Sequence, residues 1–501
     1  MNFKNLIFLL FSLNFFISIA QKEVLSVKID DNTAMLPRTK DGFNFLNTNN
    51  GDLVIIMIDK KMGFANLFDK DFNEKSAATF DPPKYEDILG YKIVGNTYKI
   101  LSSNNSKKKF LVLSIDFDSK KVSEKEFKFD FDDEKYLETV HYNNQLFLFT
   151  STKENVFIIR ELGEDGFETL KSFQVENRNE SFFDNVLVSL DPTTSEGFYD
   201  ENRKQKLLKR EQIFGSLKSN ITKIDNRVPN AIEQTASNNK LYQKDNLIYL
   251  TIEDEENLQT IFYRINLENL SMEQAFYEYP KGRIWDFEKY NSFILDDKIF
   301  QLGINIDEMK IVIKNFEGKV LKDFYIEKNQ PINFKNSPII QDGQTFVPLV
   351  NHRELEETSK YLRKVLSGNI GISGYKDDNL YYLTIGGCIE IKGGSMGVMG
   401  GSYNTTISTT GGIPSVSTVY IRPTFYSYSS YASTKSTFFN THLDSEFNYV
   451  AKDESDNIFD RIKKFKKGIQ YESAEDIFLY KGKVYFTYYN LKEKLLKIIE
   501  M

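Results

Sequence analysis

A strand–turn–strand unit recurs through this chain at intervals of about 46 to 50 residues. Five copies are clear, with sequences such as FANLFDKDFNEKSAATF and KIVIKNFEGKVLKDFYI, and they begin at Phe64, Phe110, Val156, Ile261 and Lys310. Successive starts are 46, 46, 105 and 49 residues apart, so the long interval leaves room for one degenerate copy. A fixed period of this size is typical of repeat architectures, in which each unit buries its apolar faces against its neighbours.

Each unit carries two further strands ahead of the part that repeats most clearly. Asn, Asp or Gly residues form a turn before an apolar run, as at Asn143 and Asn144 before QLFLFT, or at Gly482 before KVYFTYY. Such turn residues favour hairpins, and β-branched and aromatic residues favour strands. The block 291–326 shows all four strands: NSFIL, KIFQLGI, MKIVIKNF and VLKDFYI. Four-stranded units of this length resemble the blades of β-propellers.

The two ends of the chain favour closure of these units into a ring. The last residues read DIFLY, KVYFTYY and KLLKIIEM, which are three strands of a unit whose fourth strand is missing. The sequence EVLSVKID, from Glu23, is a strand with no partner nearby. If this first strand completes the last blade, the ring is closed by the chain ends and no stack of blades is left open.

We therefore predict an all-β fold, a β-propeller-like ring of about seven four-stranded blades (six to eight) whose last blade is closed by the N-terminal strand. A β-sandwich pair or an open solenoid is the alternative architecture. Residues 21–501 form a single domain in this interpretation. The predicted insertions are a loop or short helix at about 191–237, a helical insert at 354–366 and a long arm at 386–431. Functional residues commonly lie on such insertions.

Residues 1–20 have the pattern of a secretion signal. Lys4 supplies the positive charge, residues 6–16 are mostly apolar, and small residues end the segment at Ala20, so we expect the mature chain to begin at Gln21. No later apolar run approaches the roughly 20 residues that a membrane-spanning helix needs. We predict an exported protein, located in the periplasm, on the cell surface or outside the cell, with no transmembrane segment after signal removal.

The composition argues against several classes of partner and of site. The net charge is −7, and nucleic-acid binding needs a positive field, so we expect no nucleic-acid partner. Cys388 is the only cysteine, which excludes an intramolecular disulfide and a multi-cysteine zinc site. The stability of an exported chain of this kind must come from its core, which is rich in Phe and Tyr.

One stretch matches a catalytic motif. Residues 393–397 (GGSMG) have the G-x-S-x-G pattern of a hydrolase nucleophile elbow, and His442 and Asp444 follow as candidate members of a triad. The elbow requires a helix after the serine, whereas VMGGSYNTTISTTGG is a poor helix former. We interpret the motif as part of a flexible, glycine-rich loop.

The remaining candidate ligands have a structural explanation. His141, His352 and His442 are far apart and show no paired metal-ligand spacing. The turn Asp69–Asn73 has oxygen-bearing residues at the spacing of a calcium loop but lacks the glycine and the final glutamate of that loop. We interpret it, and the similar stretch Asp130–Asp133, as hairpin turns, because Asp and Asn favour turns for backbone reasons.

Three surface segments remain as binding candidates. The basic runs Arg203–Arg210 and Arg461–Lys467 are candidates for an anionic polymer or headgroup, with solvated loops balanced by nearby acids as the simpler interpretation. The aromatic series Thr418–Tyr431 is a candidate sugar-stacking or partner-binding surface, with an ordinary strand pair as the simpler interpretation.

The sequence assigns no catalytic, cofactor-binding or metal-binding residue, and it indicates no cofactor. The first hypothesis for function is an exported, non-catalytic binding or scaffolding protein of the cell envelope or extracellular space. Its partner would be an unknown protein or glycan, with the arm at 386–431 as the contact surface. The alternative is an exported hydrolase or lyase that acts on polysaccharide or peptide, with its site at the axis of the ring.

Overall fold

A computed structural model describes most of the chain, and it places the following residues: 21–29, 41–59, 61–85, 87–131, 134–152, 154–175, 221–342, 352–377, 379–388, 436–454 and 456–501. In this part of the chain there are thirty strands and three helices. Among these helices, none has the length and apolar character needed to cross a membrane. The secretion signal predicted at residues 1–20 lies outside the described residues.

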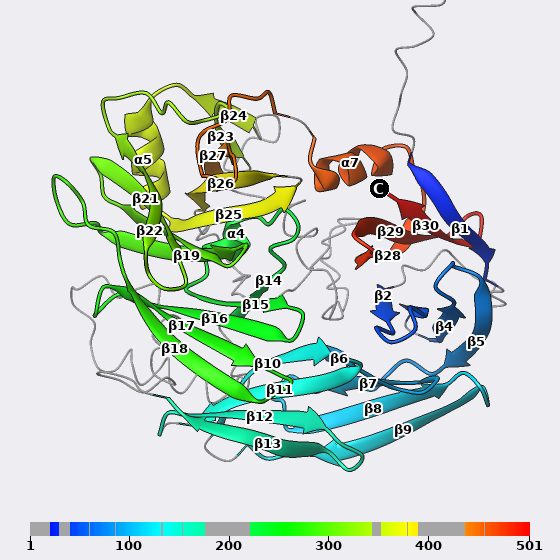
Figure 1. The fold of residues 1–501 in the computed structure, drawn as a ribbon. Coiled ribbons are helices and arrows are strands. Elements are labelled where there is room, and N and C mark those ends of the chain that lie inside the picture. Colours follow the sequence, from blue (N-terminus) through cyan, green and yellow to red (C-terminus); the bar gives the residue numbers. More distant parts are fainter. Residues whose placement is uncertain are drawn as a thin grey trace, which may run out of the picture.

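The strands form seven sheets that are arranged around a ring as the blades of a β-propeller (Figure 1). Within the described ranges, five sheets have four strands and two have five. We number the blades in chain order. The fold class predicted from the repeat period is therefore confirmed, with seven blades as expected.

The strands of blades 1 to 3 alternate with short turns. Blade 1 contains β2 (Asp41–Leu46), β3 (Leu53–Ile58), β4 (Gly63–Phe68) and β5 (Glu74–Phe80). Blade 2 contains β6 (Asp87–Val94), β7 (Thr97–Ser103), β8 (Lys109–Asp116) and β9 (Lys121–Lys128). Blade 3 contains β10 (Glu134–Tyr142), β11 (Gln145–Thr152), β12 (Val156–Leu162) and β13 (Phe167–Gln174).

Blades 4 and 6 carry the additional strands. Blade 4 contains β14 (Ile221–Ile224), β15 (Asn239–Lys244), β16 (Leu247–Asp254), β17 (Gln259–Asn266) and β18 (Ser271–Glu278). Blade 5 contains β19 (Lys289–Leu295), β20 (Lys298–Ile304), β21 (Glu308–Asn315) and β22 (Val320–Glu327). Blade 6 contains β23 (Ile339–Asp342), β24 (His352–Leu355), β25 (Asn369–Asp377), β26 (Leu380–Cys388) and β27 (Ser436–Leu443). Blade 7 contains β28 (Glu472–Tyr480), β29 (Lys483–Asn490), β30 (Leu495–Glu500) and β1 (Lys22–Lys28).

The turns predicted from Asn and Asp pairs have the backbone geometry that such residues tolerate. Asn143 and Asn144 have φ of 47° and 61°, and Asp296 and Asp297 have φ of 49° and 58°. Two consecutive residues with positive φ make a type I′ turn, whose twist matches that of the two strands it joins. Asn and Asp enter this region more readily than other residues with a side chain. The local sequence therefore sets the register of these hairpins.

The first and last strands close the ring. Strand β1 pairs antiparallel with β30, from Lys22 opposite Glu500 to Lys28 opposite Leu495. Figure 1 shows the blue first strand beside the red strands of the C-terminal blade. The prediction that the N-terminal strand completes the last blade is confirmed.

A buried carboxylate joins blade 7 to blade 1. Asp476 on β28 is 2% exposed, and its Oδ2 accepts hydrogen bonds from the backbone N and from Nδ2 of Asn44 on β2, each at 2.9 Å. The Asn44 amide also donates to Thr487 Oγ1 at 3.1 Å. Because this contact is buried, water could not take the place of a lost carboxylate, and two N–H donors of Asn44 would be left without an acceptor.

Apolar clusters fill the space between most neighbouring blades. Separate clusters join blades 1 and 2, blades 2 and 3, blades 3 and 4, and blades 7 and 1, and one larger cluster joins blades 4, 5 and 6. Between blades 6 and 7 the packing differs. There, helix α7 (Ile458–Lys466) places Phe459 and Ile462 against Ile477 and Phe486 of blade 7, and Figure 1 shows this helix between the two blades.

No blade lies between the third and fourth repeats in the described part of the chain. Leu137 and Phe149 of blade 3 belong to the same buried cluster as Leu241 and Leu250 of blade 4, so these two blades are direct neighbours. The expectation of a degenerate copy in that interval is therefore wrong, because a long connection in the sequence joins blades that are adjacent in space. Both blades beyond the five clear copies follow Pro338 instead.

The predicted insertions are described in part. In the region predicted at 191–237, the described residues form β14, which pairs parallel with β15, and the short helix α4 (Ile232–Thr235). In the region predicted at 354–366, helix α5 (Thr358–Leu366) is preceded by strand β24 rather than by more helix. Residues 389–435, which include most of the predicted arm, lie outside the described residues.

We predict that Asp476→Ala lowers the free energy of unfolding by about 3 kcal/mol, because two buried donors of Asn44 lose their acceptor. Urea unfolding of residues 21–501, followed by circular dichroism, measures this change. Asp71→Ala is the matched control, since Asp71 is exposed in a hairpin turn and its replacement should change stability by less than about 0.5 kcal/mol. Equal effects of the two substitutions would show that the contact between blades 7 and 1 does not hold the ring.

Candidate functional site

Blade 6 has two chemically different faces. On one face, Ile372, Leu383 and Phe439 belong to the apolar cluster shared with blade 5. The opposite face carries polar and aromatic side chains from β25, β26 and β27, and we call these six residues the polar face: Ser373, Tyr375, Tyr382, Thr384, Asn440 and His442. Alternation along each strand places them together, because residues two apart lie on the same side of a sheet.

Helix α7 forms the wall opposite the polar face, and its first residues explain where it starts. Asn457 Oδ1 accepts hydrogen bonds from the backbone N of Phe459 at 2.8 Å and of Asp460 at 3.0 Å, and the Asp460 carboxylate accepts one from the backbone N of Asn457 at 3.2 Å. This reciprocal arrangement is a capping box. Asn457, Asp460 and Lys463 are spaced three residues apart, so they share one side of the helix, whereas Phe459 and Ile462 pack on blade 7.

A cavity of about 330 Å³ lies between the polar face and α7, and we call it the seam cavity. The segment 229–232 also lines it, together with Ile340 and Asp342 of β23. Ser373 Oγ donates a hydrogen bond of 2.8 Å to the carbonyl oxygen of Asn230, which ties this segment to the polar face. The volume is near the lower end of the range for small-ligand sites, which is roughly 300–1,000 Å³.

An aromatic row crosses the polar face. The rings of Tyr375 and Tyr382 are parallel, with an interplanar angle of 8° and centroids 5.0 Å apart. The ring of His442 follows, with its centroid 4.7 Å from that of Tyr382. On the outer side, Lys452 Nζ lies 5.9 Å from the Tyr382 ring centroid and 3.4 Å from its hydroxyl oxygen. The row therefore offers aromatic surface and polar groups side by side.

His442 is a buried side chain of the polar face. It is 4% exposed, and burial together with the nearby Lys452 ammonium group lowers its pKa below the usual value. Its Nδ1 is buried and finds no hydrogen-bond partner among the described residues, and the same holds for Ser436 Oγ, which also lines the cavity. Buried polar atoms are normally paired, so such atoms call for a functional or structural explanation.

The carboxylates around the seam cavity are engaged with other groups. Glu454 accepts a hydrogen bond from the Asn440 amide, and Asp456 forms an ion pair with Lys464. Burial lowers the pKa of Lys463, while the negative charges of Asp460 and Asp342 act in the opposite direction. In the described part of the chain, no three His, Cys, Asp or Glu side chains are gathered as a metal site requires.

The candidate triad does not assemble in the described residues. The motif at 393–397 lies outside them, as do the aromatic series Thr418–Tyr431 and the basic run Arg203–Arg210. His442 lines the seam cavity, but Asp444 uses its carboxylate in its own turn. There it accepts hydrogen bonds from the backbone N of Glu446 and of Asn448 at 2.9 and 2.8 Å.

The other candidate ligands have structural roles where they are described. The Asp69 carboxylate accepts hydrogen bonds from the backbone N of Asp71 and of Asn73, each at 2.9 Å, which closes the turn between β4 and β5. This confirms the interpretation of Asp69–Asn73 as a hairpin turn. Cys388 is buried beside Ile232.

The basic run Arg461–Lys467 belongs mostly to α7. Lys464 pairs with Asp456, and Lys466 pairs with Glu475 at 2.5 Å. The simpler interpretation predicted a solvated loop with balancing acids: acids do pair with these two lysines, but the loop is wrong, because the residues form a helix.

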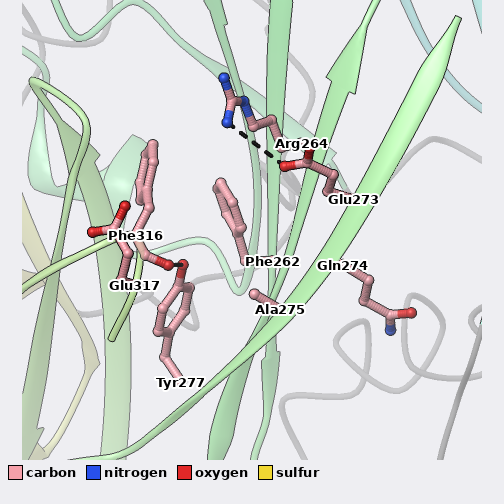
Figure 2. A pocket seen from close by; sticks show the side chains of 8 residues that line it. All are labelled: Phe262, Arg264, Glu273, Gln274, Ala275, Tyr277, Phe316 and Glu317. Carbon is pink, nitrogen blue, oxygen red and sulfur yellow. Dashed lines mark hydrogen bonds and ion pairs between the residues drawn. The ribbon is translucent and has the colours of Figure 1, made fainter. Parts of the chain in front are cut away.

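Two other surfaces are weaker candidates for a ligand. Figure 2 shows a pocket at blades 4 and 5 in which Arg264 faces Glu273 and the Tyr277 hydroxyl donates to the carbonyl oxygen of Phe316. Its volume of about 170 Å³ is below the usual range of ligand sites. Trp285 is 69% exposed on the loop between β18 and β19, and it lines neither this pocket nor the seam cavity.

Comparisons with known proteins do not identify a function. No protein family matches the chain, and no curated protein matches it. Among solved structures, the chain resembles the β-propeller domain of the Trilobed protease from Pyrococcus furiosus, at 9% identity over 93% of this chain and 94% of that one, with a TM-score of 0.31. It also resembles the N-terminal domain of Nup159, at 9% identity over 96% and 94%, with a TM-score of 0.32.

A third resemblance is to an uncharacterized protein from Listeria monocytogenes EGD-e, at 9% identity over 95% of this chain and 97% of that one, with a TM-score of 0.32. TM-scores this low carry no argument about function. The propeller assignment rests on the seven sheets and their order.

The sequence contains partial signals for the seam cavity, although none of the motifs discussed above indicated it. Asn457 followed by Asp460 is a readable capping box, and it marks the start of α7. Tyr375 and Tyr382 stand at alternating positions within apolar strands, which indicates one polar side of a sheet. No spacing rule relates these segments to each other, so the sequence alone did not bring them to one cavity.

His141 provides a test of how folding changes the pKa of a histidine side chain in this protein. Its ring stacks on Tyr91 with centroids 3.9 Å apart, and burial lowers its pKa from 6.5 to about 3. The unfolded chain therefore binds a proton near pH 6.5 that the folded chain does not bind until near pH 3. Stability is consequently lost as the pH falls through this window, by up to about 1.4 kcal/mol per pH unit.

We predict that His141→Phe makes the free energy of unfolding less dependent on pH between about pH 6.5 and about pH 5. Urea unfolding at several pH values measures the slope, with Tyr471→Phe as a control that leaves the slope unchanged, since Tyr471 is 53% exposed. A variant with the slope of the unaltered protein would contradict the lowered pKa of this half-buried imidazole.

Proposed function

We propose that this protein is an exported, non-catalytic binding protein of the cell envelope or extracellular space, and that it holds its ligand in the seam cavity. The fold supplies the frame, because a propeller surrounds its binding sites with rigid blades. Propellers have many functions, so the proposal depends on the site rather than on the fold.

The observation that carries the proposal is the polar face of blade 6. At the other seams, the described blades pack through apolar clusters. Blade 6 instead turns Tyr375, Tyr382 and His442 toward a cavity, and this sacrifices apolar burial that would stabilise the ring. Departures from the best packing are expected where a protein has a binding task.

The contacts of the carboxylates favour binding over catalysis. Asp460 is held in the capping box, Glu454 by Asn440, and Asp456 by Lys464. A carboxylate that acts as a general acid or nucleophile must be available to the substrate. The hydrolase or lyase alternative placed its site at the ring axis, whereas the seam cavity lies between the polar face of blade 6 and α7.

Export rests on the sequence pattern of residues 1–20. Because Cys388 is the only cysteine, an exported chain would depend for its stability on apolar burial and ring closure, without an intramolecular disulfide. The arm predicted at 386–431 joins β26 to β27, and the pair Cys388–Ser436 holds its two ends. Ser436 lines the seam cavity.

A thermal-shift screen of residues 21–501 against soluble glycans, peptides and envelope fragments tests the proposal. We predict at least one compound that raises the unfolding midpoint. At about 100 times its dissociation constant, such a ligand adds about 2.7 kcal/mol to the stability of the folded chain. The shift should be lost in Tyr382→Ala, which removes the centre of the aromatic row.

Trp285→Ala is the matched control, because it removes an exposed aromatic side chain on the loop between blades 4 and 5 and leaves the seam cavity intact. A shift that survives in Tyr382→Ala and disappears in Trp285→Ala would place the site elsewhere. Chromatography of the bound compound after incubation distinguishes the alternative, since a hydrolase or lyase would convert it to products.

A further inference from the structure

We infer that the seam cavity is a saccharide site that accommodates one or two neutral sugar rings. This inference rests on the proposed binding function and specifies its ligand class. It follows from three properties of the cavity: the engagement of its charged groups with neighbouring side chains, its unpaired polar atoms and its apolar lining.

The charged groups that line the cavity are engaged with neighbouring side chains. Four acids line it, namely Asp342, Glu454, Asp456 and Asp460. Asp456 pairs with Lys464, and Asp342 and Asp460 lie near the partly buried Lys463. A ligand with a net charge would need an unpaired opposite charge in the site, because a charge taken out of water is costly without one. A neutral ligand meets no such penalty.

The unpaired polar atoms match a ligand that both donates and accepts hydrogen bonds. Nδ1 of His442 and Oγ of Ser436 are buried and have no hydrogen-bond partner in the described ranges. Imidazole and hydroxyl groups can each donate or accept, as can the hydroxyls of Tyr375 and Tyr382 in the same lining. A polyhydroxylated ring presents hydroxyl groups of the same dual character. Both atoms are covered by neighbouring groups, so rotation of neighbouring side chains must expose them as the ligand enters.

The remaining lining suits the C–H faces of a sugar ring. Ile232, Ile340 and Phe438 line the cavity beside the polar groups. Small-ligand sites typically combine apolar surface with a few placed polar groups. A volume of about 330 Å³ limits the occupant to a small ligand or to the end of a longer chain. A zwitterionic peptide end fits less well, because each of its charges would compete with a pair already formed.

Isothermal titration calorimetry with matched disaccharides tests this inference on residues 21–501. The neutral panel is cellobiose, maltose, lactose, mannobiose and N,N′-diacetylchitobiose. The charged compounds are chitobiose, which has the diacetylchitobiose skeleton with two ammonium groups, and digalacturonate, which is anionic. We expect at least one neutral disaccharide to bind, and both charged compounds to bind at least about tenfold more weakly, which corresponds to about 1.4 kcal/mol.

The variants assign the binding to the cavity. Tyr382→Phe removes one hydroxyl and keeps the ring, and His442→Phe removes the unpaired nitrogen. Each should weaken binding of the neutral disaccharide about tenfold, the loss expected for one hydrogen bond to a ligand. Tyr471→Phe should leave binding unchanged. Circular dichroism checks that each variant is folded, and Tyr382→Phe decides the result if His442→Phe does not fold.

Three results would overturn the inference. If no neutral disaccharide binds while a peptide or charged compound raises the unfolding midpoint and loses this effect in Tyr382→Ala, the saccharide class is wrong and the binding function stands. If neutral disaccharides bind equally to all variants, the cavity is not their site. If no compound of any class binds the folded protein, the saccharide inference and the proposed binding function both fail.

Discussion

Closure of the ring is the constraint on which the rest of this structure depends. Each blade has two faces to cover, and a row of blades leaves two faces exposed unless its ends meet. Here the first strand, Lys22–Lys28, pairs with the last, Leu495–Glu500, and Asp476 binds Asn44 where blades 7 and 1 meet. One contact is a sheet ladder at the outer strand, and the other is a buried charge–amide contact between inner strands. Together they join two parts of the chain that are more than 400 residues apart.

The seam between blades 6 and 7 shows how a closed ring can carry a polar site. Helix α7 covers the apolar surface of blade 7 with Phe459 and Ile462, so blade 6 is not needed for that task. Its second face is then free to carry Tyr375, Tyr382 and His442 beside a cavity. The apolar clusters at the other seams supply the stability that this seam forgoes. The same division explains why the carboxylates near α7 hold the helix in place as well as lining the cavity.

Much of the fold could be predicted because its causes are local. Hairpins such as that at Asn143 and Asn144 are set by residues that tolerate positive φ, and the repeat period follows from four strands of similar length. Closure of the ring could also be predicted, because the C-terminal end of the sequence has three strands of a four-stranded unit and the N-terminal end has one strand without a neighbouring partner. The error over the 105-residue interval has a physical reason as well. The length of a connection does not set the distance between the elements it joins.

The sequence by itself determined the strands, their turns, the four-stranded unit and the strand that closes the ring, because neighbouring residues specify these features through backbone preference and alternation. Only the tertiary structure decided the site. Segment 229–232, the polar face of blade 6 and residues 454–463 meet in the seam cavity, although long stretches of chain separate them. Their meeting depends on which blade faces pack together and on where α7 lies. These are outcomes of apolar burial and ring geometry over the whole domain, and no local pattern of residues encodes them.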